Sequence, residues 1–384
     1  MAPRARSSSR GRSVGTVRAY PRSPNELLTG PDRLPFVTLP QRAPGGFPVV
    51  GIIGGGQLAR MCQPTSVGLS ITLSVFAESA DAPAPLVVPS STIGDVTDLE
   101  AVRAFASQCD VVTFDHEDVP AEVLAALQAD GVVMHPSPAA LGFTQDTLAM
   151  RRRLTEIGVA CDLDKGSGLL VDGLLAEQRA DVVRELAVLV ARSPSGQAAA
   201  WPVVEMVRAD SICTQVLAPA PGLDPAFAAV ATEATLRIAG ELGVTGVMSV
   251  GMFEVRDELT GVPAYVVNEL AMRPHHSGHW TIDGAVTSQF EQHLRAVLDL
   301  PLGDTSPRAR WTVTGTVLGG IYGDLYPTYR HLMARDPGLK IHLYGKGVRP
   351  GRTIGHVTVS GNDLDDLRAR ANHACDFLQG VITQ

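Results

Sequence analysis

The chain has 384 residues, which is enough for two or three domains of roughly 150 residues each. Apolar residues make up 45% and charged residues 19%, a balance that excludes disorder throughout the chain. No uncharged apolar run reaches the roughly 20 residues of a membrane-spanning helix. The five cysteines are scattered and form no C-x-x-C pair, which is typical of core residues in a reducing compartment. We therefore expect a cytoplasmic protein without a membrane partner.

The net charge of −8 is unevenly distributed along the chain. Residues 1–47 carry eight arginines against Glu26 and Asp32, which gives +6 and leaves the remainder near −14. So acidic a body excludes broad nucleic-acid binding, because that function needs a basic face. The arginine-rich start has the character of a transit peptide, although a disordered extension is the simpler interpretation. We expect the fold to begin near Phe47.

Short apolar strands then alternate with helices. We expect strands at 47–53, 69–76, 111–114 and 131–135, and helices at 57–67, 98–108 and 119–129. Pro64 should kink the first of these helices or end it early. This alternation predicts a doubly wound parallel sheet. A further helix, over residues 146–157, leads out of that domain.

The rest of the chain favours antiparallel strands. We expect them at 185–192, 199–205, 212–217, 247–255, 264–270, 312–318, 340–344 and 354–359. The pair 247–255 and 264–270 predicts a hairpin. Long helices are expected over 224–242 and 363–378. The fold class is therefore α/β followed by α+β, with a small β-rich domain at the end.

The first motif is GIIGGGQLAR, in which Gly54, Gly56 and Ala59 fit the pattern G-x-G-x-x-A between a strand and a helix. Glycines there let the backbone approach a phosphate at a helix N-terminus. Glu78 lies where the acid of a dinucleotide-binding fold would stand. Alone, the motif is weak evidence for a nicotinamide cofactor, because a simple tight turn has the same sequence.

The second motif, VVTFDHEDVP, places acids and a histidine after the third strand, at the carboxyl edge where α/β sheets bind ligands. His116 or Glu117 could hold a polar ligand there. Alternatively, the segment is a solvated helix start that Asp118 caps.

The third motif is the densest, VVNELAMRPHHSGHWT over residues 266–281. Asn268 and Glu269 offer the oxygen ligands that Mg²⁺ prefers. One loop then carries Arg273, His275, His276, Ser277 and His279. Three histidines can indicate zinc, but the loop has neither the glutamate of H-E-x-x-H nor a cysteine. We interpret it as a loop that hydrogen-bonds a polar, phosphorylated substrate.

The fourth motif, YGKGVRPGRTIGHV, is a compact cationic loop in an acidic protein. Lys346, Arg349 and Arg352 surround its glycines and proline. Arginine offers paired donors to phosphate, so the loop suits a phosphate group. A surface hairpin turn is the alternative.

Together these motifs carry a resemblance that runs in order from about residue 48 to residue 380. The matching segments are GGGQLARM (54–61), TFDHEDVP (113–120), RELAVLVARSPSGQ (184–197), VTGVMSVGMFE (244–254), NELAMRPHHSGHWTIDGAVTSQFEQHLRA (268–296) and RPGRTIGHV (349–357). The chain resembles the 5-(carboxyamino)imidazole ribonucleotide synthases, ATP-grasp enzymes of bacterial and fungal purine synthesis, most of all their actinobacterial form.

Residues 1–47 are expected to be a disordered extension, and the resemblance implies three domains after it. These are a pre-ATP-grasp domain like that of biotin carboxylase over 48–145, an ATP-grasp domain over 146–308 that is shortened between 159 and 176, and a C-terminal domain over 309–384. It also implies ATP- and bicarbonate-dependent carboxylation of 5-aminoimidazole ribonucleotide by a homodimer that uses Mg²⁺ and binds no nucleic acid.

Site residues follow from the resemblance in the same way. It implies ATP binding by Glu177, Glu185, Arg208, Asn268 and Glu269, with Glu269 also holding the metal. It implies a ribonucleotide site made of Gly56, Gln57, Glu117, His275, Ser277, His279, Lys346, Arg349 and Arg352. Arg273 and His275 are the implied catalytic residues.

The chain departs from the family pattern mainly in its ATP-binding half. The substituted positions are Thr147, Gly251, His276, Thr316 and Thr353. Gly251 replaces the first of two metal-binding glutamates, and Glu254 should lie on the opposite face of that strand. A catalytically impaired member that still binds ribonucleotide is therefore an alternative to a functional synthase.

Overall fold

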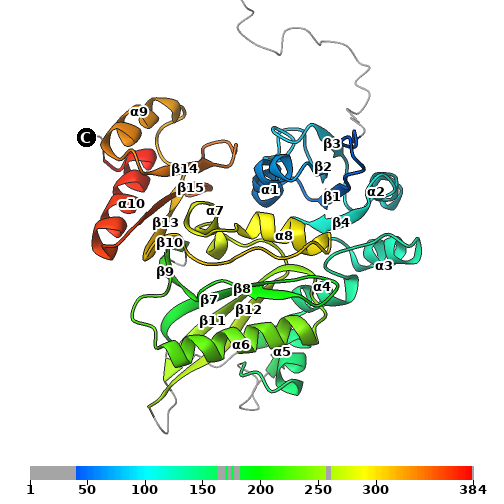
Figure 1. The fold of residues 1–384 in the computed structure, drawn as a ribbon, viewed down its shortest axis with the longest axis horizontal. Helices are drawn as coiled ribbons and strands as arrows, with labels where there is room; N and C mark the ends of the chain where they lie inside the picture. The colour runs from blue at the N-terminus through cyan, green and yellow to red at the C-terminus, as the bar shows by residue number, and fades with distance from the viewer. Residues whose placement is uncertain are drawn as a thin grey trace, which may run out of the picture. The chain divides into compact units, whose positions relative to one another are not determined.

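Parallel and antiparallel sheets occupy different parts of the chain (Figure 1). The computed structural model describes residues 40–161, 169–171, 174–176, 182–210, 212–256 and 261–382. All of these belong to one unit that spans Val37–Gln384. Among them, no helix is long and apolar enough to cross a membrane.

The first part of the chain forms the predicted parallel sheet. Its strands are β1 (Val49–Ile53), β2 (Thr72–Ala77), β3 (Ser90–Ile93) and β4 (Val111–Phe114), in the order β3-β2-β1-β4. Its helices are α1 (Gln57–Gly68), α2 (Leu99–Ala106) and α3 (Ala121–Ala129). Every residue of β1 and β4 is buried. Continuous apolar runs are typical of parallel strands covered on both faces, which is why sequence located these two well.

Two expectations about this domain were wrong. Residues 131–135 form no strand; Met134 makes only a single bridge to Val112, and β3 is the fourth strand instead. The sequence of β3 is SSTI, which carries no strong apolar signal. Helix α1 continues past Pro64 to Gly68, because its buried face packs with the later helix α8 and offsets the lost hydrogen bond.

Contacts with the sheet also begin earlier than the expected start at Phe47. Arg42 donates two hydrogen bonds to Asp110, at 2.6 and 2.9 Å. The backbone oxygen of Gln41 accepts from the hydroxyl of Thr72 at 2.9 Å. These contacts attach residues 41–42 to the edge of the sheet.

The remaining strands confirm the predicted antiparallel pattern and form one sheet of nine. They are β7 (Val182–Arg192), β8 (Ala198–Ala200), β9 (Val204–Ala209), β10 (Ile212–Ala218), β11 (Gly246–Arg256), β12 (Pro263–Ala271), β13 (Trp311–Leu318), β14 (Lys340–Leu343) and β15 (Thr353–Gly361). Their order is β12-β11-β7-β9-β10-β13-β15-β14, and β8 pairs with β7. Strands β11 and β12 are the predicted hairpin. A separate pair is β5 (Leu169–Val171) with β6 (Leu174–Ala176).

The pairing of β10 with β13 makes the C-terminal strands continuous with the central ones. The helices around this sheet are α4 (Pro138–Gln145), α5 (Thr147–Glu156), α6 (Pro225–Glu241), α7 (Thr281–Gly284), α8 (Gln289–Val297), α9 (Tyr326–Arg335) and α10 (Leu364–Gln379). Four of these helices were not predicted: α4, which Ser137 caps, and α7, α8 and α9.

Strand β7 alternates between two cores. Leu186 and Val188 belong to the core that α6 covers, whereas Ala187 and Leu189 belong to the core that contains Trp280. This period of two is that of an extended strand. The central sheet therefore has one face toward α6 and a second face toward the segment after β12.

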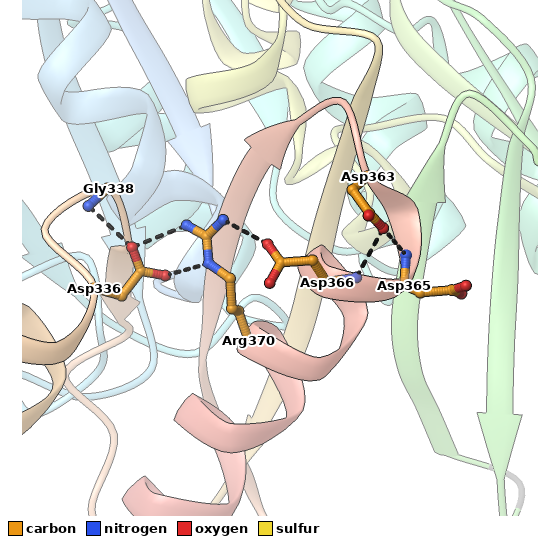
Figure 2. A network of polar contacts seen from close by, with 6 residues as sticks. All are labelled: Asp336, Gly338, Asp363, Asp365, Asp366 and Arg370. Carbon is orange, nitrogen blue, oxygen red and sulfur yellow. Dashed lines mark hydrogen bonds and ion pairs between the residues drawn. The ribbon is translucent and has the colours of Figure 1, made fainter.

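The start of α10 is held by a polar network (Figure 2). Asp363 is its N-cap and accepts from the backbone N–H groups of Asp365 and Asp366, both at 3.1 Å. Arg370 then donates to both carboxylate oxygens of Asp336, at 2.8 and 2.9 Å, and to Asp366 at 3.2 Å. The network joins α10 to the end of α9.

We predict that Asp363→Ala lowers the free energy of unfolding by about 1 kcal/mol, the usual effect of losing an N-cap side chain. Asn362→Ala is the matched control, since Asn362 is an exposed neighbour outside this network. Urea denaturation measures both. Equal stability of Asp363→Ala and the control would show that the cap contributes nothing.

Candidate active site

The glycine turn before α1 is closed by a carboxylate that sequence reasoning missed. Asp115 follows β4 directly, is buried, and accepts from the backbone N–H of Ala59 at 3.1 Å. A Cβ atom on Gly56 would lie 2.0 Å from Asp115 Oδ2, so this position needs glycine for the close approach. Burial raises the pKa of Asp115, and the hydrogen bonds from Ala59 and Gly56 oppose that shift.

This carboxylate bears on the nicotinamide interpretation. In a dinucleotide fold, the amides at this helix end would face a pyrophosphate. Here Asp115 binds the Ala59 amide, and Gln57, the first residue of α1, is half-buried beside it. Glu78 lies 3.4 Å from His116 Nε2. The G-x-G-x-x-A pattern therefore serves a turn that a buried carboxyl group of this chain closes.

An ion pair connects the segment after β4 with the loop after β12. Arg273 Nε donates to Glu117 Oε2 at 2.9 Å, although 156 residues separate the two. Asp118 is not a helix cap, as its backbone N–H donates to His116 Nδ1 and Pro120 occupies the N-cap of α3. Glu117 and Arg273 are thus brought together as the motifs suggested.

The histidine loop is held by Gln289, the first residue of α8. Its Oε1 accepts from the His275 backbone N–H at 2.8 Å, and its Nε2 donates to the His275 carbonyl at 2.8 Å. Nε2 also lies 3.1 Å from His279 Nδ1. All three residues are buried. Gln289 was not predicted as part of the site, because nothing local in its sequence indicates this partner.

Ser277 attaches the same loop to the central sheet. Its hydroxyl lies 2.9 Å from His275 Nδ1 and 3.2 Å from the hydroxyl of Ser249 on β11. The Ser277 backbone N–H donates to His275 Nδ1 at 3.4 Å. His275 Nδ1 therefore accepts a hydrogen bond, which leaves the proton of the neutral ring on Nε2.

Burial keeps the histidines of this loop neutral. It lowers the pKa of His275 and His279 well below the ordinary 6.5, with neighbouring histidines and arginines adding to the effect. Burial likewise lowers the pKa of His276 to about 4, and Arg208 and Arg273 contribute. The positive charge of the site thus comes from arginine and lysine.

A β-bulge at Asn268 determines how the predicted metal pair is presented. Glu269 pairs with Gly251 of β11, but Met252 pairs with Val267, so Asn268 is an extra residue. Val267 and Leu270 consequently share one core although they are three residues apart. Asn268 and Glu269 lie between them and both remain outside that core.

The side chain of Glu269 covers Gly251. A Cβ atom on Gly251 would lie 2.8 Å from Glu269 Cγ. Arg208 is close enough for its charge to act on both Glu269 and His276. The predicted ATP-binding and substrate-binding residues therefore meet around His276.

Glu185 and Arg208 pair with each other. Arg208 Nη2 donates to Glu185 Oε1 at 2.7 Å, and its Nε donates to Oε2. Glu254 instead accepts from Arg184 Nε at 2.6 Å. Because Arg184 and Glu185 are adjacent on β7, this confirms that Glu254 lies on the opposite face. Glu177 lies outside the described residues.

The cationic loop connects β14 to β15 and reaches the glycine turn. Burial lowers the pKa of Lys346, Arg352 adds to the shift, and the nearby Asp115 opposes it. Gly319 fixes the loop through its N–H to the Arg352 carbonyl at 2.8 Å and its carbonyl to the Gly351 N–H at 3.0 Å. Like Arg352, Arg349 is exposed. The loop is thus both a hairpin connection and a wall of the site.

Another buried histidine joins three elements beside the site. His293 of α8 accepts from the Val247 backbone N–H at 3.1 Å through Nδ1, and its Nε2 lies 2.8 Å from the Thr113 hydroxyl. Burial lowers the pKa of His293 to about 3. The fold therefore requires the neutral ring.

We predict that the free energy of unfolding falls as the pH drops from 6.5 towards 4. The unfolded chain binds protons at its ordinary histidine pKa of 6.5, whereas folded His276 and His293 stay neutral until about pH 4 and 3. His293→Gln should be less stable at pH 7 and lose less stability on acidification. Urea denaturation at several pH values measures this, and a stability that is constant from pH 7 to 5 would contradict it.

Three family models match successive parts of the chain. They are a ribonucleotide synthetase preATP-grasp domain (residues 48–145), an ATP-grasp domain (153–290) and a phosphoribosylaminoimidazole carboxylase C-terminal domain (316–370). Helices and strands of all three are described above. The domain limits inferred from the resemblance remain predictions.

Relatives and solved structures agree with these matches. The chain is 46% identical to an N5-carboxyaminoimidazole ribonucleotide synthase of Mycobacterium tuberculosis, covering 86% of this chain and 88% of that one. It is 42% identical to that of Corynebacterium ammoniagenes, covering 92% and 96%. The Thermus thermophilus synthetase structure has a TM-score of 0.76 and 31% identity, covering 87% of this chain and 99% of that one. The chain belongs to the N5-carboxyaminoimidazole ribonucleotide synthase family.

Proposed function

We propose that this chain catalyses ATP- and bicarbonate-dependent carboxylation of the exocyclic amine of 5-aminoimidazole ribonucleotide, a carbon–nitrogen ligation in purine biosynthesis. The Glu117–Arg273 ion pair is the observation that carries the proposal. It joins the glycine-turn edge to the histidine loop, the two parts of the proposed ribonucleotide site. Arg208, on the surface assigned to ATP, is close enough for its charge to act on His276 of that loop. We further propose that the enzyme acts in the cytoplasm as a homodimer.

ATP is assigned to the face of the sheet that carries Glu185, Arg208, Asn268 and Glu269, together with Glu177. A related structure from Aspergillus clavatus is a complex with ATP. Its sequence is 28% identical to this chain, and the match covers 88% of this chain and 99% of that one. Arg208 gives this surface a cation beside two carboxylates. Cations around the phosphates are what phosphoryl transfer requires.

Mg²⁺ fits the oxygen donors of Asn268 and Glu269, which the bulge directs away from the core. Within the described residues, no group of three or more His, Cys, Asp or Glu side chains could hold a metal by itself. The ion would therefore share its coordination with ATP phosphates and water. When bound, it supplies charge neutralisation to the transferring phosphoryl group.

The ribonucleotide is assigned to the glycine turn, the histidine loop and the cationic loop. The residues are Gly56, Gln57, Glu117, His275, Ser277, His279, Lys346, Arg349 and Arg352. A second Aspergillus clavatus structure is a complex with ADP and 5-aminoimidazole ribonucleotide, at 30% identity and a TM-score of 0.77. The cationic loop suits the phosphate. The histidine loop, whose imidazoles are neutral, suits the sugar and base.

Two residues are proposed as catalytic. We assign Arg273 to the reacting carboxyl unit. Glu117 accepts a hydrogen bond from its Nε and fixes the direction of the guanidinium. His275 carries its proton on Nε2, because Nδ1 accepts from Ser277, and can donate to an oxygen that gains negative charge. Neither role needs the histidine to be charged.

The alternative of an impaired family member is not favoured. Relatives that match most of this chain at 42–46% identity are synthases, and all three family models match. The alignment with the Mycobacterium tuberculosis relative spans 381 positions, and 86% of this 384-residue chain takes part in it. About 50 aligned positions therefore have a residue in the relative and none in this chain. The substitution at Gly251 leaves Glu269 in place as the carboxylate of the pair.

The test is phosphate release from ATP with Mg²⁺, bicarbonate and 5-aminoimidazole ribonucleotide, together with capture of isotopically labelled bicarbonate in the product. We expect release that depends on the ribonucleotide, and a labelled carboxyl group on its amine. Arg273→Met should abolish both. Phosphate release at the same rate with and without the ribonucleotide would refute the proposal, and so would the absence of phosphate release.

We predict that Gly251→Ala raises the Mg²⁺ concentration needed for half-maximal activity, because the new methyl group displaces Glu269. Loss of a single electrostatic contact of this kind lowers the rate by a factor on the order of 10²–10³. We expect a smaller effect here, because the contact is displaced and not removed. Gly142→Ala is the control, since a methyl group there meets open space. An unchanged Mg²⁺ dependence would contradict the role of Glu269.

A further inference from the structure

Three histidine rings form a stack beside the histidine loop and the cationic loop. His342 of β14 and His356 of β15 are directly opposite in the strand register, and their ring centroids are 4.6 Å apart at 22°. His356 also stacks on His279, at 4.8 Å and 26°. At the outer end, His342 Nε2 lies 2.7 Å from Asp283 Oδ2. The stack thus runs from the C-terminal strands to the histidine loop.

Tyr344 joins this stack from the side. Its hydroxyl is 2.8 Å from His356 Nδ1, and both residues are buried, with 3% and 1% of their surface exposed. The ring of Tyr344 lies under Lys346, whose Nζ is 5.7 Å from the ring centroid. Tyr344 therefore contacts the stack through its hydroxyl and the cationic loop through its ring.

The contacts form an unbroken path between two substrate loops. Lys346 rests on Tyr344, Tyr344 bonds His356, and His356 stacks on His279. Gln289 then links His279 to the backbone of His275. Burying a phenol and several imidazoles costs free energy unless their polar atoms are hydrogen-bonded. Hydrogen bonds that meet this need also fix the geometry of the groups that they join.

We propose that Tyr344 and His356 are positioning residues that set Lys346 and His279 in place for ribonucleotide binding. The inference rests on the proposed function, because that function assigns Lys346 and His279 to the ribonucleotide. It adds two residues that need no contact with the substrate. Since neither belongs to the surface assigned to ATP, their effect should be confined to the ribonucleotide.

The direct test is Tyr344→Phe, which keeps the ring under Lys346 and removes only the hydroxyl. We expect the KM for 5-aminoimidazole ribonucleotide to rise about 3- to 10-fold, the range for one neutral hydrogen bond. The KM for ATP and kcat should change less than about twofold. Tyr329→Phe on α9 is the matched control, as it removes a hydroxyl outside the stack.

His356→Phe provides the second variant, because it keeps an aromatic ring in the stack and removes the bond to Tyr344. If the hydroxyl bond carries the effect, the double variant should raise the ribonucleotide KM no further than either single variant. A fall in melting temperature with equal rises in both KM values would show a merely structural role and overturn the inference. So would an unchanged ribonucleotide KM in Tyr344→Phe.

Failure of this inference is separable from failure of the proposed function. If the unmodified chain shows no ribonucleotide-dependent phosphate release, the function itself is refuted, and the inference with it. If the unmodified chain is active and Tyr344→Phe behaves as Tyr329→Phe does, only the positioning role is refuted.

Discussion

Side chains on β7 and β11 alternate between two cores, and this alternation decides which groups can reach the site. Leu186 and Val188 pack under α6, so Glu185 lies on the opposite face, toward the histidine loop. Ser249 and Gly251 lie on that same face of β11. The bulge at Asn268 interrupts this period on β12, and it leaves both predicted metal ligands outside the core.

Charged and neutral groups have separate places around this face. The guanidinium groups of Arg208 and Arg273 come from a strand and a loop and are each paired with a glutamate. The imidazoles of His275 and His279 are buried and neutral, and hydrogen bonds to Ser277 and Gln289 hold them. Hydrogen bonds between neutral groups therefore hold the histidines, while the charged groups of this face are held in ion pairs.

A single local pattern can serve two purposes, as the glycine turn illustrates. G-x-G-x-x-A lets a backbone approach an anion, but the pattern does not state which anion. In this chain the group that approaches the turn is the buried carboxyl of Asp115, which directly follows β4. The cationic side chains that we assign to the phosphate, Lys346, Arg349 and Arg352, lie instead in a loop far away in sequence.

Sequence alone determined the strands and helices whose apolar period is strong, such as 111–114 and the hairpin of β11 and β12, because that period is local. It also located the motifs of the site. It failed at residues 131–135, where an apolar run makes a single bridge. Only the tertiary structure supplied Asp115, Gln289 and the contact between Tyr344 and His356. Their hydrogen-bond partners are chosen by packing between distant segments, and no local pattern records that choice.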